Sequence, residues 1–170
     1  SVTPHQLYGT LLEGESKADD LRRYRYGKGN FQLHYVLEGP VTWRTPGVET
    51  VQLLHLTPGL DGVSKAGNEA ERGLLPEVPT ICVGQPCAAD PTRAPDGKSV
   101  LWLQMPEAPR HVKGDAKGEI SVPEDGSWTP ELREAFADRV EQILASHIDG
   151  FTSKVVTRRA ISPADLAGMN

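Results

Sequence analysis

The sequence lacks three features that would assign it to large classes of protein. No apolar run approaches the roughly 18 residues that a membrane-spanning helix needs. No basic segment followed by an apolar one opens the chain, as a secretory signal would. Positive charge is also scarce, with 18 Lys and Arg against 23 Asp and Glu, a net charge of -5 and a pI near 5.5. Nucleic-acid-binding proteins usually carry a basic surface, so we expect no nucleic-acid partner and no membrane span.

Cysteine is rare as well. The two cysteines are Cys82 and Cys87, and the C-x4-C spacing fits neither a C-x2-C metal half-site nor a redox pair. Cys82 lies in the apolar run TICVG, which predicts a buried thiol packed as a small hydrophobic side chain. A disulfide or a reactive thiol is the alternative. Sparse cysteine is typical of a reducing compartment, and we expect the protein in the cytoplasm.

Motifs that hold cofactors or carry catalysis are absent. The segment GKG at 27–29 is not G-x-G-x-x-G, and the sequence contains no P-loop, H-E-x-x-H or G-x-S-x-G. No two of the five histidines stand at metal-ligand spacing. A chain without these patterns does not hold a dinucleotide in the usual way. The sequence therefore assigns no catalytic, cofactor-binding or metal-binding residue.

Strand patterns are clear in what is present. The 170 residues, 38% apolar and 24% charged, predict one globular domain with a sizeable core. The alternation in FQLHYVLEG, from Phe31 to Gly39, predicts a strand with one buried face. Further strands are predicted at 50–56, 79–87 and 99–106. Because Asp96-Gly97 is a strong turn signal, the last two should form a hairpin with a long connection. Residues 107–127 are predicted to be an exposed loop.

Helix signals complete the pattern. Thr3-Pro4 predicts a helix over 2–14 with Leu7, Leu11 and Leu12 facing inward. A second helix is predicted within 57–76, and a third begins at Thr129-Pro130 and stops at Gly150. A strand and a helix starting at Ser162 follow. The order predicts an α+β fold with one mostly antiparallel (mixed) sheet and helices packed on one face. Since the chain ends just after a helix begins, we expect an incomplete portion of a larger protein.

Four residues are candidates for a substrate pocket. His34 and His55 are polar residues within predicted strands, so both could point to the same face of the sheet. Trp102 and Gln104 share a strand face with Val100. If that face is uncovered, these side chains would line a pocket. The alternatives are structural or surface histidines and a tryptophan that only packs in the core.

Two charged groups have no assigned role. Asp90, Arg93, Asp96 and Lys98 lie close together in the long connection, as a loop with local salt bridges or as a docking loop for another domain. Arg158 and Arg159 are either solvated charges or contacts for an acidic group on a partner or on a missing domain.

A family resemblance joins several of these segments. It rests on Gly39-Pro40 with Trp43, on the segment from Asp90-Pro91 to Gly97-Lys98, and on Ser162-Pro163-Ala164-Asp165-Leu166. From about Tyr24 to Asn170 the chain resembles the middle of the phytoene-dehydrogenase-like FAD-dependent oxidoreductases. It is most similar to the branch that contains the pyridine nucleotide-disulfide oxidoreductase domain-containing protein.

The resemblance implies a role for the whole chain. Residues 1–170 would be a single central, substrate-binding domain, with the FAD-binding domain in the same polypeptide but outside this chain. The full enzyme would pass a hydride from a small organic substrate to FAD, and this fragment alone would be inactive. The alternatives are a free-standing α+β ligand-binding or interaction module without flavin, and a small hydrolase or isomerase using His34 or His55. An uncovered sheet face would also favour a homodimer.

Overall fold

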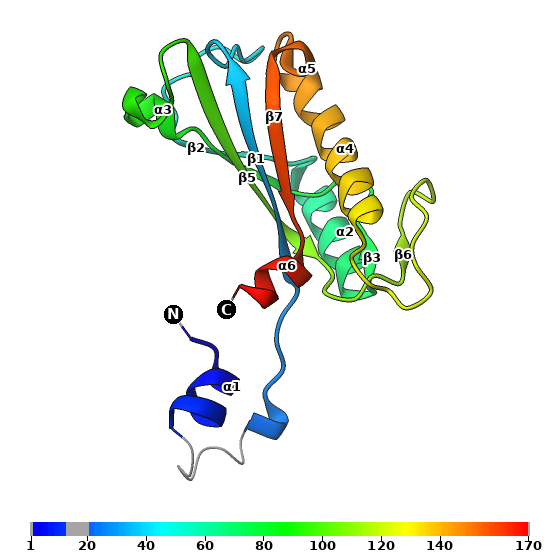
Figure 1. The fold of residues 1–170 in the computed structure, drawn as a ribbon. Helices are drawn as coiled ribbons and strands as arrows, with labels where there is room; N and C mark the ends of the chain where they lie inside the picture. Colours follow the sequence, from blue (N-terminus) through cyan, green and yellow to red (C-terminus); the bar gives the residue numbers. More distant parts are fainter. Residues whose placement is uncertain (1, 13–20, 170) are drawn as a thin grey trace.

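The computed structural model describes residues 2–12 and 21–169. Its centre is a five-stranded antiparallel sheet with the strand order β2-β4-β5-β1-β7 (Figure 1). The strands of this sheet are β1 Gly29–Glu38, β2 Leu53–Leu56, β4 Ile81–Gly84, β5 Lys98–Ala108 and β7 Val155–Ile161. A separate parallel pair joins β3 (Leu74–Leu75) to β6 (Gly114–Asp115).

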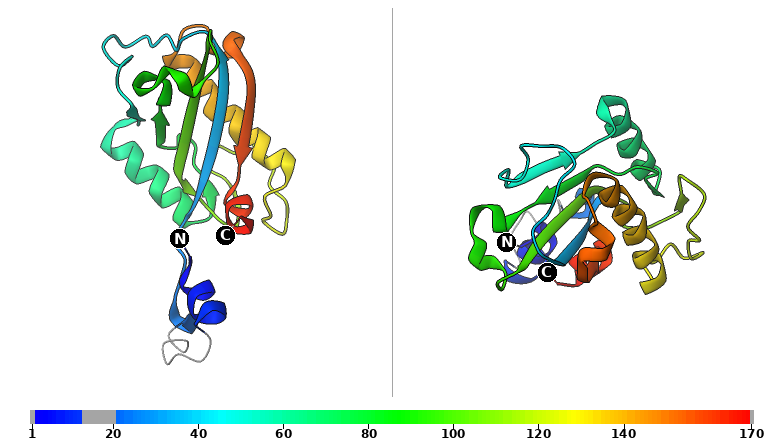
Figure 2. Two further views of the ribbon diagram at one scale, coloured as in Figure 1. Left: turned by 60° about the vertical axis from the view of Figure 1, so that its left-hand side comes forward. Right: turned by 90° about the horizontal axis from the view of Figure 1, so that it is seen from above.

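Two long helices, α2 (Gly59–Glu71) and α4 (Pro130–His147), lie on one side of the sheet (Figure 2). The short helices are α1 Pro4–Gln6, α3 Pro86–Ala89, α5 Phe151–Lys154 and α6 Pro163–Gly168. A π-helical turn, η1 (Leu7–Leu11), continues α1, and a 3-10 turn, η3 (Pro91–Arg93), follows α3. The predicted α+β class, with an antiparallel sheet and helices on one face, is confirmed.

The core lies between the sheet and α4. Alternate residues of β1 and β5 point toward the helices and are at most 1% exposed: Phe31, Leu33, Tyr35, Leu37, Leu101, Leu103 and Met105. The Phe31 ring meets Phe136 of α4 edge to face, with 5.0 Å between ring centres. Fully burying one such side chain stabilises a fold by about 1.5–3 kcal/mol. The two-residue alternation predicted for both strands therefore matches the alternate side chains that β1 and β5 contribute to this core.

Local sequence signals determine where helices α4 and α6 begin. The Thr129 hydroxyl accepts a hydrogen bond from the amide of Leu132 at 3.3 Å, with Pro130 in the first turn of α4. Ser162 and Asp165 form a capping box that opens α6. A Cβ atom on Gly29 would lie 2.4 Å from Cβ of Pro163, so glycine allows α6 to pack closely on the start of β1.

The prediction that residues 107–127 form an exposed loop is wrong in part. Glu107, Ala108 and Pro109 are buried, and β6 lies within this range. The two terminal nitrogens of the Arg139 guanidinium on α4 donate to the Asp115 carboxylate, at 2.6 and 2.7 Å. The pattern of polar residues could not reveal this order, because the partner that holds Asp115 lies on a distant helix.

Several predicted boundaries also differ. The strand predicted at 50–56 covers only Leu53–Leu56, and the one predicted at 79–87 stops at Gly84, because Pro86 begins α3. Helix α4 is capped at Ile148, and Gly150 instead precedes α5 with a positive φ of 66°. The first predicted helix runs partly through residues 13 and 14, which lie outside the described residues. Leu11 and Leu12, predicted to face inward, are 63% and 43% exposed.

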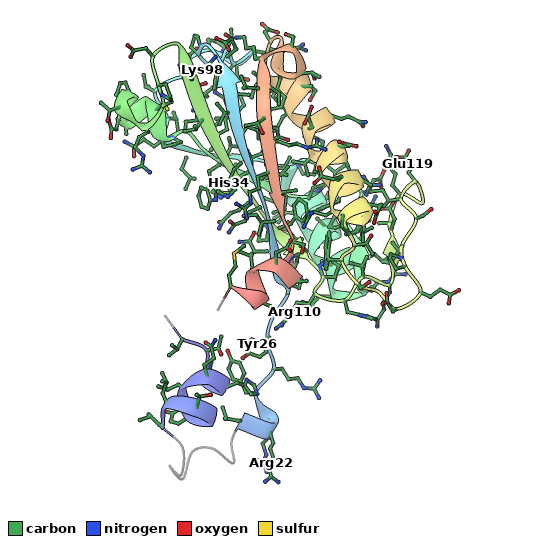
Figure 3. All side chains as sticks on the ribbon, in the orientation of Figure 1. Arg22, Tyr26, His34, Lys98, Arg110 and Glu119 are labelled. Atoms are coloured by element: carbon green, nitrogen blue, oxygen red, sulfur yellow. The ribbon has the colours of Figure 1, made fainter. Side chains whose placement is uncertain are left out.

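The N-terminal segment lies beside α6 at one end of the sheet. The Arg110 guanidinium sits 4.8 Å from the ring centre of Tyr26, and His5 stacks on the same ring at 5.2 Å (Figure 3). Within the part of the chain that the structure describes, no helix combines the length and the apolar character that a membrane span requires.

Candidate functional site on the open face of the sheet

The face of the sheet opposite the helices carries a different set of side chains. Residues paired across an antiparallel sheet point to the same side, so the register defines rows that cross the strands. One row contains Leu53, Gly84, Trp102, His34 and Arg159. The next row toward α6 contains His55, Cys82, Gln104, Gln32 and Ile161. We call this side of the sheet the open face; Figure 3 shows His34 on it, pointing away from α4.

A hollow of about 460 Å³ lies on the open face. The side chains that the open face contributes to it are His34 and Val36 from β1, Val100 and Trp102 from β5, and Thr157 and Arg159 from β7. Pro86 of α3 and Arg93 of η3 complete the wall. The long connection between β4 and β5 therefore reaches the site. The volume of the hollow falls within the range of about 300–1,000 Å³ that is typical of small-molecule sites.

Trp102 owes its position to a glycine on the neighbouring strand. A Cβ atom on Gly84 would lie 2.9 Å from Cε3 of the Trp102 ring. The ring therefore lies over the bare backbone of β4, where a larger residue would displace it. Half-buried Trp102, Val36 and Val100 give the hollow an apolar floor.

The polar part of the hollow is basic. Of the residues that line it, none is acidic, and two arginines, Arg93 and Arg159, have no ion-pair partner among the described residues. Burial first, and then the charge of Arg159, lower the pKa of His34 below 6.5. The lowered pKa favours the neutral imidazole of His34, which can donate one hydrogen bond and accept another.

The structure brings some of the predicted pocket residues together and separates others. His34 and Trp102 are direct cross-strand partners and both line the hollow. Gln104 lies on the same face in the next row, opposite Gln32. His55 is also on this face but lies on β2, three strands away from β1, which corresponds to about 14 Å at the usual strand spacing. The pocket role of all four residues stays a prediction.

Sequence reasoning missed part of the hollow. Val36 shares the alternation of His34, so the period of two could have identified it, as it identified Val100 on the face of Trp102. Arg93 and Arg159 were each singled out for their charge alone. No local pattern indicates that residues from β5 and β7 flank His34, because this depends on the strand order.

Among the described residues, Cys82, Cys87, His34 and His55 form no disulfide, no hydrogen-bonded pair with a carboxylate and no metal-binding group. Cys82 and Cys87 are both free and half-buried, and burial raises the pKa of Cys82. No carboxylate forms a hydrogen bond with His34 or His55 in the described ranges. These ranges also contain no group of three or more His, Cys, Asp and Glu side chains that could hold a metal ion.

Comparison with known proteins shows a similarity to an oxidoreductase. The chain is 28% identical over 102 residues to the Pyridine nucleotide-disulfide oxidoreductase domain-containing protein 2 of Mus musculus. The matched segment is 60% of this chain and 16% of the mouse protein, so the chain corresponds to a small part of that relative's length. No protein-family model matches the chain. The similarity supports a distant relationship to an oxidoreductase; the phytoene-dehydrogenase-like assignment stays a prediction.

Proposed function

We propose that this chain is the central, substrate-side domain of an FAD-dependent oxidoreductase of the phytoene desaturase and amine oxidase type. In this proposal the full-length enzyme transfers a hydride from an organic substrate to FAD, and the chain alone is not catalytic. The similarity to the mouse protein supports the oxidoreductase class. The open face supplies the place where a substrate would lie.

The observation that carries the proposal is the contrast between the two faces of the sheet. The side that packs on α4 is closed by core residues that are at most 1% exposed, whereas the open face carries a hollow beside His34 and Trp102. Half-buried Trp102 supplies an apolar surface in this hollow, and the exposed His34 beside it supplies a hydrogen-bonding group. A domain built this way can form one wall of a substrate site.

The residues of this chain do not themselves fit FAD. A dinucleotide needs a glycine-rich turn that opens a helix, and the sequence contains no such motif. The flavin would therefore be held by the rest of the polypeptide, where it would supply the redox chemistry. In the proposal Val36, Val100 and Trp102 bind the apolar part of the substrate, and His34 orients a polar group by hydrogen bonding.

The test is to determine the coding sequence on both sides of this segment and to purify the complete gene product. We expect an upstream strand followed by G-x-G-x-x-G and a purified protein with the absorbance spectrum of bound flavin. The 170-residue chain, purified in parallel, should carry none. A start codon just before Ser1 and a stop codon after Asn170 would contradict the proposal and favour a free-standing binding module. So would a longer product that neither contains flavin nor takes up added FAD.

A further inference from the structure

We propose that the hollow on the open face binds a substrate with an apolar or aromatic body and one carboxylate, and that Arg159 and Arg93 hold the carboxylate. This inference rests on the proposed function, because it names the substrate class of the same site. It follows from the charges, the apolar floor and the size of the hollow.

The charges come first. Four other arginines of the fold have carboxylate partners: Arg139 has Asp115, Arg133 has Asp165, Arg44 has Asp149, and Arg158 has Glu134, Asp138 and Glu141. Arg72 and Arg110 have no ion pair among the described residues, but neither lines the hollow. Arg159 and Arg93 have no ion pair in the described part of the chain, yet they face the same hollow. Two guanidinium groups beside one cavity that no acid lines favour an anion, and the planar fork of arginine matches a carboxylate.

Asp90 and Asp96 are both three residues from Arg93 in the sequence, and the Asp90 carboxylate is already hydrogen-bonded within its own turn. The Asp90 carboxylate accepts hydrogen bonds from the amide and the hydroxyl of Thr92, at 3.0 and 2.6 Å. These bonds first, and then the charge of Arg93, lower the pKa of Asp90. Asp90 thus serves as the cap of η3, and it does not line the hollow.

The apolar floor of the hollow indicates that the rest of the substrate is apolar. Val36 and Val100 are direct partners across β1 and β5, and Trp102 lies one row further along the same face. Pro86 closes the side formed by α3. Because these groups offer no hydrogen bond except through the Trp102 indole, they would bind a hydrocarbon or an aromatic ring.

His34 joins the two parts of the site. The register places it opposite Trp102 on one side and opposite Arg159 on the other. As a neutral imidazole it can donate a hydrogen bond to a carboxylate oxygen without adding charge. The hollow, at about 460 Å³, suits a small molecule rather than a segment of folded protein.

The experiment compares two probes of the same shape on the complete gene product. Calorimetry measures the Kd of 2-naphthoate, which is anionic, and of 2-naphthamide, which is neutral. We expect the carboxylate to bind at least about tenfold more tightly, as a charge-assisted hydrogen bond predicts. Arg159→Gln should weaken naphthoate binding by about tenfold and leave the binding of the amide unchanged. Arg93→Gln should act in the same direction, and Arg159→Lys should recover part of the loss.

Arg72→Gln is the matched control, since Arg72 is an exposed arginine that caps α2 and does not line the hollow. Circular dichroism of each variant checks that the fold is retained. The proposal is overturned if the wild-type protein does not bind naphthoate, if the amide binds equally well, or if Arg159→Gln and Arg93→Gln leave the Kd unchanged. It is also overturned if inorganic pyrophosphate displaces naphthoate at lower concentration than a second aromatic carboxylate, benzoate, because the arginines would then serve a cofactor phosphate.

The same samples separate this inference from the proposed function. Bound flavin together with a Kd that does not depend on Arg159 would refute the carboxylate site and leave the oxidoreductase intact. Charge-dependent naphthoate binding by a product without flavin would support the carboxylate site and refute the oxidoreductase.

Discussion

Arg158 and Arg159 are neighbours in β7 and point to opposite faces of the sheet. Arg158 reaches α4, where its guanidinium contacts Glu141 at 2.7 Å and Glu134 at 3.0 Å, and also contacts Asp138. Glu141 also accepts a hydrogen bond from the Tyr35 hydroxyl at 3.3 Å. Arg159 faces the hollow without an ion-pair partner in the described residues. The same residue type therefore stabilises the fold on one face and remains available to a ligand on the other.

This contrast predicts different effects on stability. Arg158→Gln removes a partly buried cation from three carboxylates and should lower the free energy of unfolding by about 2 kcal/mol. Arg159→Gln, on the open face, should change it by no more than about 0.5 kcal/mol. Urea unfolding followed by circular dichroism measures both. Equal losses for the two variants would contradict the assignment of Arg159 to ligand binding.

The pKa of His34 should depend on Arg159. The charged residues that line the hollow with His34 are Arg158 and Arg159 from β7 and Arg93 from η3, and no acidic residue lines it. The Arg158 guanidinium extends to the carboxylates of α4, so Arg159 and Arg93 are the charges on the side of His34. Removing the positive charge in Arg159→Gln favours the imidazolium form, so the pKa of His34 should rise. An NMR titration of the His34 imidazole protons measures the change, with Arg72→Gln as control. A fall in the pKa would show that Arg159 does not act through its charge.

The sign of the matching stability effect follows from linkage. Because the pKa of folded His34 is lowered, the unfolded chain binds a proton first as the pH falls below about 6.5. His34 therefore contributes a loss of stability that begins below that pH and grows until the pH passes the folded-state pKa. The loss should be smaller in Arg159→Gln. Urea midpoints at pH 7.5 and at about pH 5.5 test this.

The Arg139–Asp115 pair should make the fold sensitive to acid. The Asp115 side chain is 1% exposed, and its burial alone would raise its pKa. The hydrogen bonds from Arg139 and from the amides of Ile120 and Glu119 outweigh burial and lower the pKa to about 2. The stabilisation is complete above the unfolded pKa of 3.8 and is lost as the pH falls toward 2.

Asp115→Asn leaves a buried Arg139 without its counter-charge and should cost about 3–5 kcal/mol. The matched control is Asp149→Asn, which changes the exposed Arg44–Asp149 pair and should cost less than about 1 kcal/mol. Urea unfolding between pH 2 and pH 7 distinguishes the two. An Asp115→Asn variant as stable as the control would show that this pair does not organise the 107–127 segment.

Gln85 should hold the segment between β4 and α3 in place beside the hollow. The Trp43 indole donates to the Gln85 side-chain oxygen at 2.7 Å, and the Gln85 amide donates to the carbonyls of Val48 and Val51 at 3.1 and 2.7 Å. Gln85→Ala would leave a buried indole N–H without a partner and should cost about 2–3 kcal/mol. Gln142→Ala on the exposed side of α4 is the control, with an expected change of no more than about 0.5 kcal/mol. Thermal unfolding of both variants measures the difference.

The open face should also favour self-association of the isolated chain. A dimer that buries the exposed apolar surface beside the hollow would be stabilised by about 25 cal/mol per Å² of buried apolar area. We expect a dimer whose fraction rises with concentration in size-exclusion chromatography with light scattering. Val36→Arg, on the open face, should weaken the dimer, whereas Leu60→Arg on α2 should not. A strict monomer at high concentration would count against this prediction.

The amino-acid sequence by itself determined the elements whose causes are local. The alternation from Phe31 to Leu37 specifies a strand with one buried face, and Thr129-Pro130 specifies where α4 begins. The Asp96-Gly97 turn, with a φ of 76° at Gly97, belongs to the β4–β5 connection that was predicted as a long hairpin. Each of these features depends on residues close together in the chain, so a pattern can reveal it.

Only the tertiary structure decided which side chains meet. The strand order puts β1 between β5 and β7, and this places His34 between Trp102 and Arg159. The same long-range packing joins Asp115 to Arg139 and so orders a segment whose composition resembles a loop. The separation of His55 from His34 likewise depends on two strands inserted between theirs. Such contacts depend on how the whole chain buries its apolar surface, and no short stretch of sequence specifies them.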